Sequence, residues 1–502
     1  MTTKVEREVK LAAWGGFSLP DLFGVVESVE SRPLAERRLD AVYYDTRDLR
    51  LARAGVSLRH RTGDDPPWTV KLPEGERGPV MNRKEIPFDG PAGGLPPQAA
   101  ALVRAYTRTA TLVPVARLKT RRTGVELVVG DQKVAEVVDD EVSVYHGRRL
   151  ASRFREVEVE IEPEAPPGLL AAVVGRLRAA GAGDADGTAK VARALGPRAM
   201  VPPDHAPIVL GTRATVGEVI QAALTAGLNR RVAHDPGVRL GDDPEDVHQA
   251  RVGTRRLRSD LRTFRPLLDR EWVTGLREEA GWYAGLLGAV RDAEVLMERL
   301  EGQASTLAKE DAAGVASLVG RLADDREAAR AHLLEAMNSP RYGELLDRLM
   351  AAAAAPLAAE GADLGQAAEE ALPALVGRPW RRLRKAVRAL PDPPADAELH
   401  AVRILAKHTR YAAEAAAPAM GKRASAFAQA VAGVQSVLGD HQDACVTEAW
   451  LRNAVGALAG PEEAMLVGQL IGLQRAEAQD RRAAWPQAWK RAADPKRRDW
   501  LD

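Results

Sequence analysis

Cysteine is scarce in this sequence, and its charges almost cancel. Cys445 is the only cysteine among 502 residues, which excludes an intramolecular disulfide framework and is typical of a reducing compartment. The formal net charge is +1 at pH 7, so bulk electrostatics predict no particular partner. The informative charges are therefore the local clusters, and their position on strands and helices decides their meaning.

Long apolar runs and the common nucleotide-binding signatures are also missing. No stretch of 18 apolar residues occurs, and the first residues, MTTKVEREVKL, lack the apolar core of a secretory signal. The alanine tract at 350–359 is short and is broken by Pro356. A glycine-rich lysine motif of the P-loop type is absent. We therefore expect a cytoplasmic protein without a membrane segment.

Residues 1 to about 200 show the alternation that is typical of β-strands. In the first predicted strand, Glu6, Glu8 and Lys10 share one face, opposite Val9 and Leu11. A phosphate chain that carries a divalent metal would satisfy all three charges, because carboxylates bind the cation and lysine binds phosphate oxygens. The alternative is a solvated outer face, which is common in antiparallel sheets.

Later predicted strands repeat this division into an apolar face and a charged face. Inside a closed antiparallel barrel the charged faces would converge on a polar lumen, with a basic wall for a polyanion and an acidic wall for its metal. Outward-facing charges are the alternative for every strand. The charged faces carry, in chain order, Arg59 and Arg61, Lys71, Arg83 with Glu85, Arg117 with Lys119 and Arg121, Glu136 with Asp140, and Glu156 with Glu158 and Glu160.

These segments resemble the CYTH domain of the triphosphate tunnel metalloenzyme superfamily between Val5 and about Leu195. The resemblance implies an eight-stranded antiparallel tunnel that binds triphosphates together with Mg²⁺ or Mn²⁺. Activities known in the family are hydrolysis of inorganic triphosphate, thiamine triphosphate and RNA triphosphate ends, and formation of cyclic AMP. The motifs that carry the likeness are Glu6-x-Glu8-x-Lys10, Tyr43-Tyr44-Asp45-Thr46, Leu58-Arg59-x-Arg61, Trp68-Thr69-Val70-Lys71-Leu72 and Glu156-x-Glu158-x-Glu160.

The resemblance also implies roles for individual residues. Glu6, Glu8 and Lys10 would form the catalytic group, and strand alternation favours Arg121 over Arg122 as the inward-facing residue. The implied metal ligands are Glu6, Glu8, Glu156, Glu158 and Glu160. The predicted phosphate contacts, with Arg83 added from the strand pattern, are Arg59, Arg61, Lys71, Arg83, Lys119, Arg121 and Lys190.

A proline-punctuated segment at 196–211 predicts a boundary between a tunnel domain at 1–200 and a helical domain at 212–485. One helical segment is strongly basic on one side. Its residues His248, Arg251, Arg255, Arg258 and Arg262 fall within an arc of roughly 80°. Five such side chains repel one another unless an anion runs alongside the helix.

The same spacing recurs at His400, Arg403, Lys407 and Arg410, and related Leu-Gly motifs follow each histidine by about 40 residues. We expect an internal duplication into two helical bundles, at about 212–350 and 365–485. The two stripes would form one basic groove; solvated faces, or arginines paired with an acidic helix, are the alternatives. Nucleic acid is disfavoured as a ligand, because the stripes lack interleaved aromatic side chains.

The helical part resembles the CHAD domain, the conserved-histidine α-helical domain, between Thr212 and Arg481. The likeness rests on His-x2-Arg-x3-Arg-Arg-Leu-Arg from His248 and on Leu-Gly-x2-Arg-Asp from Leu287, with looser copies from His400 and Leu438. It implies that inorganic polyphosphate binds along a basic channel. The implied phosphate contacts are His248, Arg251, Arg255, Arg258, Arg262, His400, Arg403, Lys407 and Arg410.

Together the two halves predict a multidomain α+β protein, a CYTH–CHAD fusion in which an eight-stranded antiparallel β tunnel precedes duplicated helical bundles. The expected function is metal-dependent hydrolysis of a triphosphate, inorganic triphosphate first of all, with polyphosphate held by the helices. A non-catalytic polyphosphate-binding or targeting protein and a nucleotide (adenylate) cyclase remain the alternatives. The expected partners are tripolyphosphate and polyphosphate, with polyphosphate-mediated association and without a membrane.

Overall fold

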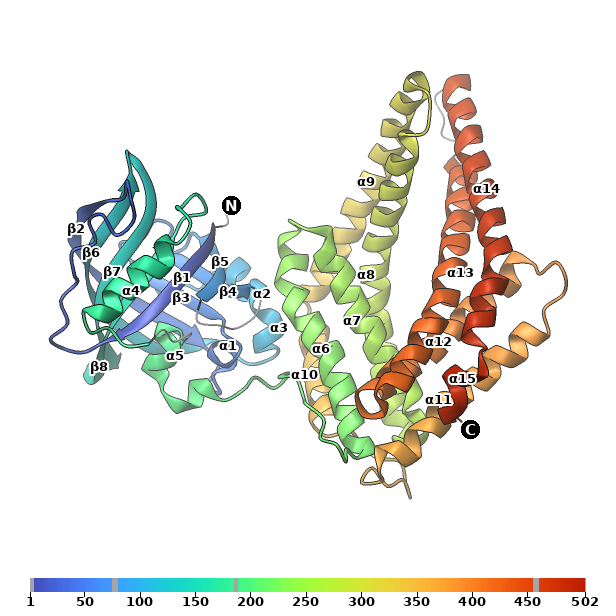
Figure 1. Ribbon diagram of the computed structural model, residues 1–502, viewed down its shortest axis with the longest axis horizontal. Coiled ribbons are helices and arrows are strands. Elements are labelled where there is room, and N and C mark those ends of the chain that lie inside the picture. The colour runs from blue at the N-terminus through green and yellow to red at the C-terminus, as the bar shows by residue number, and fades with distance from the viewer. Residues whose placement is uncertain (1–3, 75–79, 185–187, 455–459, 502) are drawn as a thin grey trace. The chain divides into compact units, whose positions relative to one another are not determined.

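The computed structural model describes residues 4–74, 80–184, 188–454 and 460–501. The chain divides into two compact units, Met1–Asp204 and His205–Asp502 (Figure 1). The change from one unit to the other falls within the proline-punctuated segment.

The first unit is built on a closed antiparallel barrel with the strand order β1-β5-β4-β3-β2-β6-β7-β8. The barrel closes because β1 pairs with both β5 and β8. This architecture confirms the predicted eight-stranded antiparallel tunnel. The strands are β1 (Lys4–Ala13), β2 (Glu30–Asp45), β3 (Ser57–Thr62), β4 (Trp68–Glu74), β5 (Val80–Phe88), β6 (Val113–Val129), β7 (Gln132–His146) and β8 (Arg149–Ile161).

Apolar side chains on the outer face of the barrel pack against helix α4 (Leu169–Ala179), which lies across the strands (Figure 1). Leu11 of β1 and Val157 and Val159 of β8 are fully buried there with Val173 of α4. Because neighbouring residues of a strand point to opposite faces, this packing turns the charged residues between them toward the barrel interior. Burial of the apolar face thus sets the direction of the charged one.

At one end the barrel interior is apolar, because helix α5 (Lys190–Leu195) packs into it. Val191 of α5 clusters with Tyr43 of β2, Leu118 of β6 and Val144 of β7, all of them buried. The remaining short helices of this unit are α1 (Arg50–Arg53), α2 (Pro97–Leu102), α3 (Arg104–Thr107) and η1 (Pro197–Met200).

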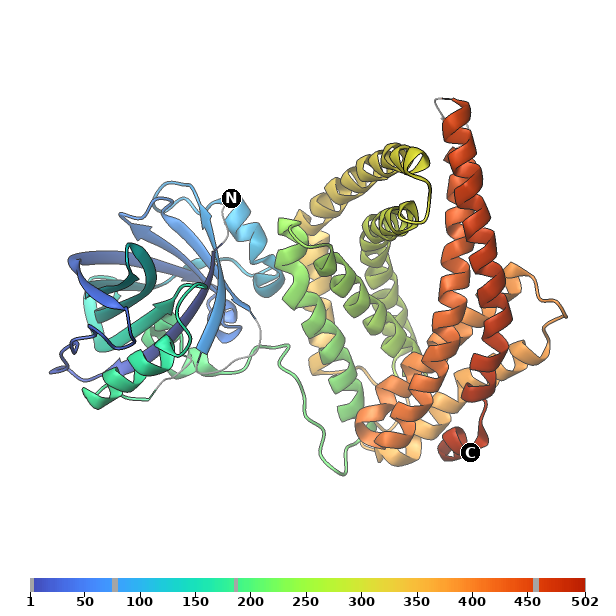
Figure 2. The ribbon, with the colours of Figure 1, turned by 45° about the horizontal axis from the view of Figure 1, so that its top comes forward.

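The second unit is all helical, as predicted. Two long helical hairpins project from it (Figure 2), and their distal ends pack through a cluster that contains Leu300, Leu318, Leu451 and Leu470. Its helices are α6 (Val216–Leu240), α7 (Pro244–Thr263), η2 (Arg265–Leu267), α8 (Arg270–Ala304), α9 (Lys309–Asn338), α10 (Pro340–Ala354), α11 (Ala368–Arg388), α12 (Asp396–Met420), α13 (Lys422–Ala454), α14 (Pro461–Ala492), α15 (Pro495–Arg498) and η4 (Asp499–Leu501).

Successive helices pack against one another in the same order in both halves, α6 to α9 and α11 to α14, and α7 also packs against α12. This order is compatible with an internal duplication, whose limits remain a prediction. Within the described part of the chain, no helix combines the length and the hydropathy needed to cross a membrane.

Candidate functional site

The barrel encloses a polar cavity of about 240 Å³, lined by side chains from all eight strands and from α5. Cations outnumber carboxylates in its lining. Their joint effect is visible at Tyr43: burial alone would raise the pKa of its hydroxyl, but Arg59 and Lys190 lower it below the ordinary value. The lining cations are Lys10, Arg37, Arg59, Arg61, Lys71, Arg83, Arg122, Lys133 and Lys190, and the lining carboxylates are Glu85, Glu136, Glu158 and Glu160.

Three carboxylates gather on one wall, where β1 pairs with β8. Glu8 lies directly opposite Glu160, and the ligand atoms of Glu8, Glu158 and Glu160 all lie within 4.8 Å of one another. Oε1 of Glu8 is buried and accepts no hydrogen bond from the described residues, although Nε of Arg83 lies 3.7 Å away. Carboxylate oxygens at this spacing suit a hard divalent cation such as Mg²⁺ or Mn²⁺. These residues therefore fit the metal that the family resemblance implies.

Lys10 lies between two of these carboxylates. Its Nζ is 3.0 Å from Oε2 of Glu8, and it also donates a hydrogen bond to Oε1 of Glu158. Burial alone would lower the pKa of Lys10, but Glu158 and Glu8 raise it above its ordinary value. Burial would likewise raise the pKa of Glu158, but Lys10 and Lys190 hold it well below its usual range. Both groups are therefore charged at neutral pH.

Glu156 lies on the same face of β8 but outside this carboxylate cluster. It is fully buried, and its carboxylate lies 3.4 Å from Nζ of Lys190 and 3.5 Å from Nη1 of Arg193. Burial raises the pKa of Glu156 despite these cations. A metal-ligand role for Glu156 remains a prediction, and so does that of Glu6, whose side chain lies outside the described part of the chain.

In strand β6, the side chains that face the barrel interior are the alternate set to the one predicted. Lys119 and Arg121 are exposed on the outer surface, whereas Leu118 and Arg122 line the cavity. The expectation that Lys119 and Arg121 face the lumen is therefore wrong. The physical reason is that the apolar residues of this segment pack inward against Val191 of α5, so the neighbouring charged residues must point outward.

Arg122 is the arginine that faces the barrel interior, and it contacts carboxylates of the acidic wall. Its Nη2 lies 2.6 Å from Oδ2 of Asp140 and 2.7 Å from Oε2 of Glu158, and Lys190 contacts the same Asp140 oxygen. Burial alone would lower the pKa of Arg122, but the hydrogen bond to Asp140 and the charge of Glu158 raise it. Arg122 and Asp140 are opposite each other on β6 and β7. This pairing places the Arg122 guanidinium beside the Asp140 carboxylate once packing against α5 has turned Arg122 inward.

The other predicted phosphate contacts reach the cavity. Arg37 and Lys133 also reach it but were missed. Arg37 precedes the segment in which alternation was read, and a β-bulge between Lys133 and Ala135 shifts the alternation of β7. That the predicted residues touch phosphate remains a prediction. Of the residues predicted to be catalytic, to bind metal or to bind phosphate, those that line the cavity are Lys10, Arg59, Arg61, Lys71, Arg83, Glu158, Glu160 and Lys190.

In the second unit the two basic stripes lie on helices that pack against each other. α7 begins at Pro244, after Asp243, whose carboxylate accepts a hydrogen bond from the Glu245 N–H. Burial, followed by the charges of Arg255 on α7 and Arg403 on α12, lowers the pKa of Lys407 to about 8. The stripes therefore act on each other as one cationic surface. We use this name for His248, Arg251, Arg255, Arg258, Arg262, His400, Arg403, Lys407 and Arg410.

Several donors of the cationic surface are unsatisfied. The Nε atoms of Arg255, Arg258 and Arg403 are buried and have no hydrogen-bond partner among the described residues. A buried donor without a partner costs about 1–3 kcal/mol, and an anion with many oxygens would remove this cost. Nearby, Nη1 of Arg262 lies 3.0 Å from Nδ1 of His408, and burial together with Arg262 lowers the pKa of His408 to about 4. This ring is therefore neutral at neutral pH.

In each half, an arginine of the cationic surface lies against the Leu-Gly motif. Nη2 of Arg251 lies 2.9 Å from Oδ1 of Asp292. A Cβ atom at Gly288 would lie 3.9 Å from Nε of Arg251, and one at Gly439 would lie 3.7 Å from Nε of Arg403. These are ordinary van der Waals distances, so the two Leu-Gly motifs lie against equivalent arginines at equivalent places.

A second basic hollow of about 860 Å³ adjoins the cationic surface at Arg262 and His408. Sequence reasoning missed its arginines on α8 and α11, although the dense basic run from Arg378 to Lys385 on α11 was a usable signal. The arginines that line the hollow are Arg262, Arg265, Arg270, Arg277, Arg378 and Arg382.

Comparison with known proteins gives the following relationships. PptA from Streptomyces chartreusis is 28% identical over an alignment that covers 55% of this chain and 100% of that chain, with a TM-score of 0.46. The CHAD domain from the plant Ricinus communis is 26% identical, covering 58% of this chain and 97% of that chain, also with a TM-score of 0.46. The uncharacterized protein Rv2226 of Mycobacterium tuberculosis is 31% identical over 500 residues, which is 92% of this chain and 91% of the relative.

Family models match both units. The CYTH domain matches residues 5–189, and the CHAD domain matches residues 222–452. CYTH proteins act on phosphoanhydrides and depend on a divalent metal, typically Mg²⁺ or Mn²⁺. The chain belongs to the CYTH–CHAD fusion proteins, with an N-terminal CYTH barrel followed by a helical CHAD domain.

Proposed function

We propose that the barrel hydrolyses the terminal phosphoanhydride bond of a linear triphosphate, with inorganic tripolyphosphate as its substrate. The observation that carries this proposal is the enclosed cavity in which cations from several strands face the Glu8, Glu158 and Glu160 cluster. A string of phosphoryl groups offers oxygens to both walls, directly to the cations and through a divalent metal to the carboxylates.

In this proposal the chain's own residues bind and orient the substrate. Arg59, Lys71 and Arg83 neutralise the phosphate oxygens, and Lys190 and Arg122 offset charge on the departing diphosphate. A bound Mg²⁺ or Mn²⁺ would supply Lewis-acid polarisation of the phosphoryl oxygens. The cavity volume is only about 240 Å³ and most lining side chains are charged, which favours an unbranched phosphate chain over a bulky nucleoside.

The test is release of phosphate from tripolyphosphate with Mg²⁺ or Mn²⁺. We expect Glu160→Gln to lower kcat/KM by about a hundredfold, because one metal ligand is lost. Lys119→Gln is the matched control, since it removes a charge on the outer surface and should leave the rate unchanged. Intact polyphosphate binding without any turnover in the wild type would support the binding-protein alternative, and cyclic product from ATP would support the cyclase.

For the helical domain we infer binding of inorganic polyphosphate along the cationic surface. The buried, unpaired Nε atoms of Arg255, Arg258 and Arg403 support this inference, because they lie on both helices that carry the stripes. Calorimetric titration of the full chain with polyphosphate of defined length tests this inference. Binding that is unchanged in an Arg255→Gln/Arg403→Gln variant would contradict the inference.

A further inference from the structure

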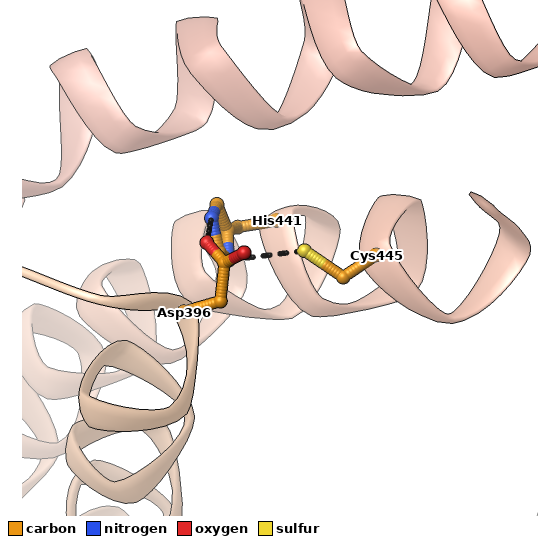
Figure 3. Close-up of side chains that lie close together, drawn as sticks. All are labelled: Asp396, His441 and Cys445. Carbon is orange, nitrogen blue, oxygen red and sulfur yellow. Dashed lines mark hydrogen bonds and ion pairs between the residues drawn. The ribbon is translucent and has the colours of Figure 1, made fainter. Parts of the chain in front are cut away.

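A histidine, a cysteine and an aspartate meet outside both sites described above. His441 and Cys445 are one helical turn apart on α13, and Asp396 is the first residue of α12 (Figure 3). Nε2 of His441 lies 3.1 Å from Oδ1 of Asp396, and Nδ1 of His441 lies 4.0 Å from Sγ of Cys445. One potential ligand atom from each residue lies within 4.8 Å of the others.

The histidine of this cluster is buried beside an exposed carboxylate. Its side chain is 1% exposed, and Nε2 lies within ion-pair distance of Oδ1 of Asp396, whose side chain is 59% exposed (Figure 3). Among the described residues, this nitrogen makes no well-aligned hydrogen bond. An ion held between the imidazole and the carboxylate would give both groups a directional partner.

We propose that Asp396, His441 and Cys445 bind a zinc-type divalent transition metal ion. Thiolate and imidazole are ligands that zinc prefers and that Mg²⁺ does not, so this site would select a different metal from the all-carboxylate cluster of the barrel. Ligand atoms around tetrahedral zinc lie roughly 3.3–3.8 Å apart, given bond lengths of about 2.0–2.3 Å. Small rotations of the side chains would close the observed spacing to this value.

Three protein ligands leave a fourth position of the ion for water or for a phosphate oxygen. The carboxylate and the thiolate together offset the charge of a divalent ion, and imidazole binds as a neutral ligand. Arg482 of α14 also contacts Oδ1 of Asp396, so the ion would share this carboxylate with the guanidinium or displace it. Binding would connect the start of α12, which carries one of the two basic stripes, to α13.

The same three residue types also occur in cysteine nucleophiles activated by histidine. Such a nucleophile needs its histidine within hydrogen-bond reach of the thiol, at about 2.6–3.2 Å. Here Nδ1 of His441 lies 4.0 Å from Sγ of Cys445, and Nε2 faces the Asp396 carboxylate. The observations therefore favour the metal, and rapid alkylation of the thiol becomes an outcome that would contradict it.

The single cysteine makes a sharp spectroscopic test possible. Titration of the untagged full chain with Co²⁺ should give a near-ultraviolet thiolate-to-cobalt charge-transfer band that saturates at one equivalent. This band can arise only at Cys445, because the chain has no other cysteine. Zn²⁺ should abolish the band by displacing Co²⁺, whereas Mg²⁺ in large excess should not.

Variants distinguish Co²⁺ binding at the proposed site from incidental binding elsewhere on the chain. Cys445→Ser should remove the band, and Asp396→Asn should weaken Co²⁺ binding about 10-fold or more, with unchanged helical circular dichroism in both. His332→Ala is the matched control, because it removes an exposed histidine of the same unit and should change nothing. The proposal is overturned if no thiolate band forms, if Asp396→Asn binds Co²⁺ as tightly as the wild type, or if iodoacetamide alkylates Cys445 equally fast with and without Zn²⁺.

Discussion

Arg121 and Arg122 are neighbours on β6, and comparing the loss of stability when each charge is removed tests which of the two side chains faces the barrel interior. Arg122 contacts Asp140 and Glu158 at 2.6 Å and 2.7 Å, and these two carboxylates are 0% and 4% exposed. Arg121 is exposed, and its contacts are with exposed glutamates. Arg122→Gln leaves buried carboxylates with less positive charge, whereas Arg121→Gln leaves only groups that water can solvate.

The magnitude follows from the contacts that remain. Removing one partner of a buried ion pair costs about 3–5 kcal/mol. Lys190 still contacts Asp140, and Lys10 still contacts Glu158, so the lower end, about 3 kcal/mol, applies to Arg122→Gln. With a denaturant slope of roughly 2 kcal/mol per molar urea, the barrel's unfolding midpoint should fall by about 1.5 M.

The assay must observe the barrel separately from the helices. Hydrogen exchange of peptides from β6 to β8, followed by mass spectrometry across a urea series, reports the barrel alone. We expect Arg121→Gln to leave the midpoint where it is in the wild type. Equal shifts for Arg121→Gln and Arg122→Gln, or a larger shift for Arg121→Gln, would refute the inward placement of Arg122.

Three further predictions concern the helical domain. Polyanions bind the charged form of Lys407, whose pKa is lowered to about 8. Polyphosphate affinity, measured by calorimetric titration, should therefore fall up to tenfold per pH unit above pH 8. The Lys407→Arg variant should flatten this pH dependence. The Arg251→Ala/Arg403→Ala variant should weaken polyphosphate binding and reduce the slope of log K against log salt by about two, while tripolyphosphate hydrolysis continues; equal loss of both activities would contradict a division of work between the domains. Burial, partly offset by Arg256, raises the pKa of Asp260 to about 7, so the folded state holds a proton that the unfolded chain releases near pH 4. The unfolding free energy should therefore fall between about pH 4 and pH 7, by at most about 4 kcal/mol, and Asp260→Asn should remove this slope.

Alternation and motif spacing predicted the architecture and much of the barrel site. Strand periodicity requires that Glu8 and Lys10 share a face, and burial of Leu11 under α4 sends that face inward. Helical periodicity likewise placed the arginines of α7 on one stripe. Both predictions depend only on local geometry, which a sequence carries directly.

Tertiary structure alone decided the phase of β6 and the meeting of the two stripes. Alternation gives two equivalent phases, and only the packing of Leu118 against Val191 of α5 selects the one that turns Arg122 inward. The cluster of Asp396, His441 and Cys445 likewise requires that the start of α12 lie beside the middle of α13. The sequence determined which faces each element has, but which face meets which neighbour depends on the free energy of packing, and that is set by contacts between residues far apart in the chain.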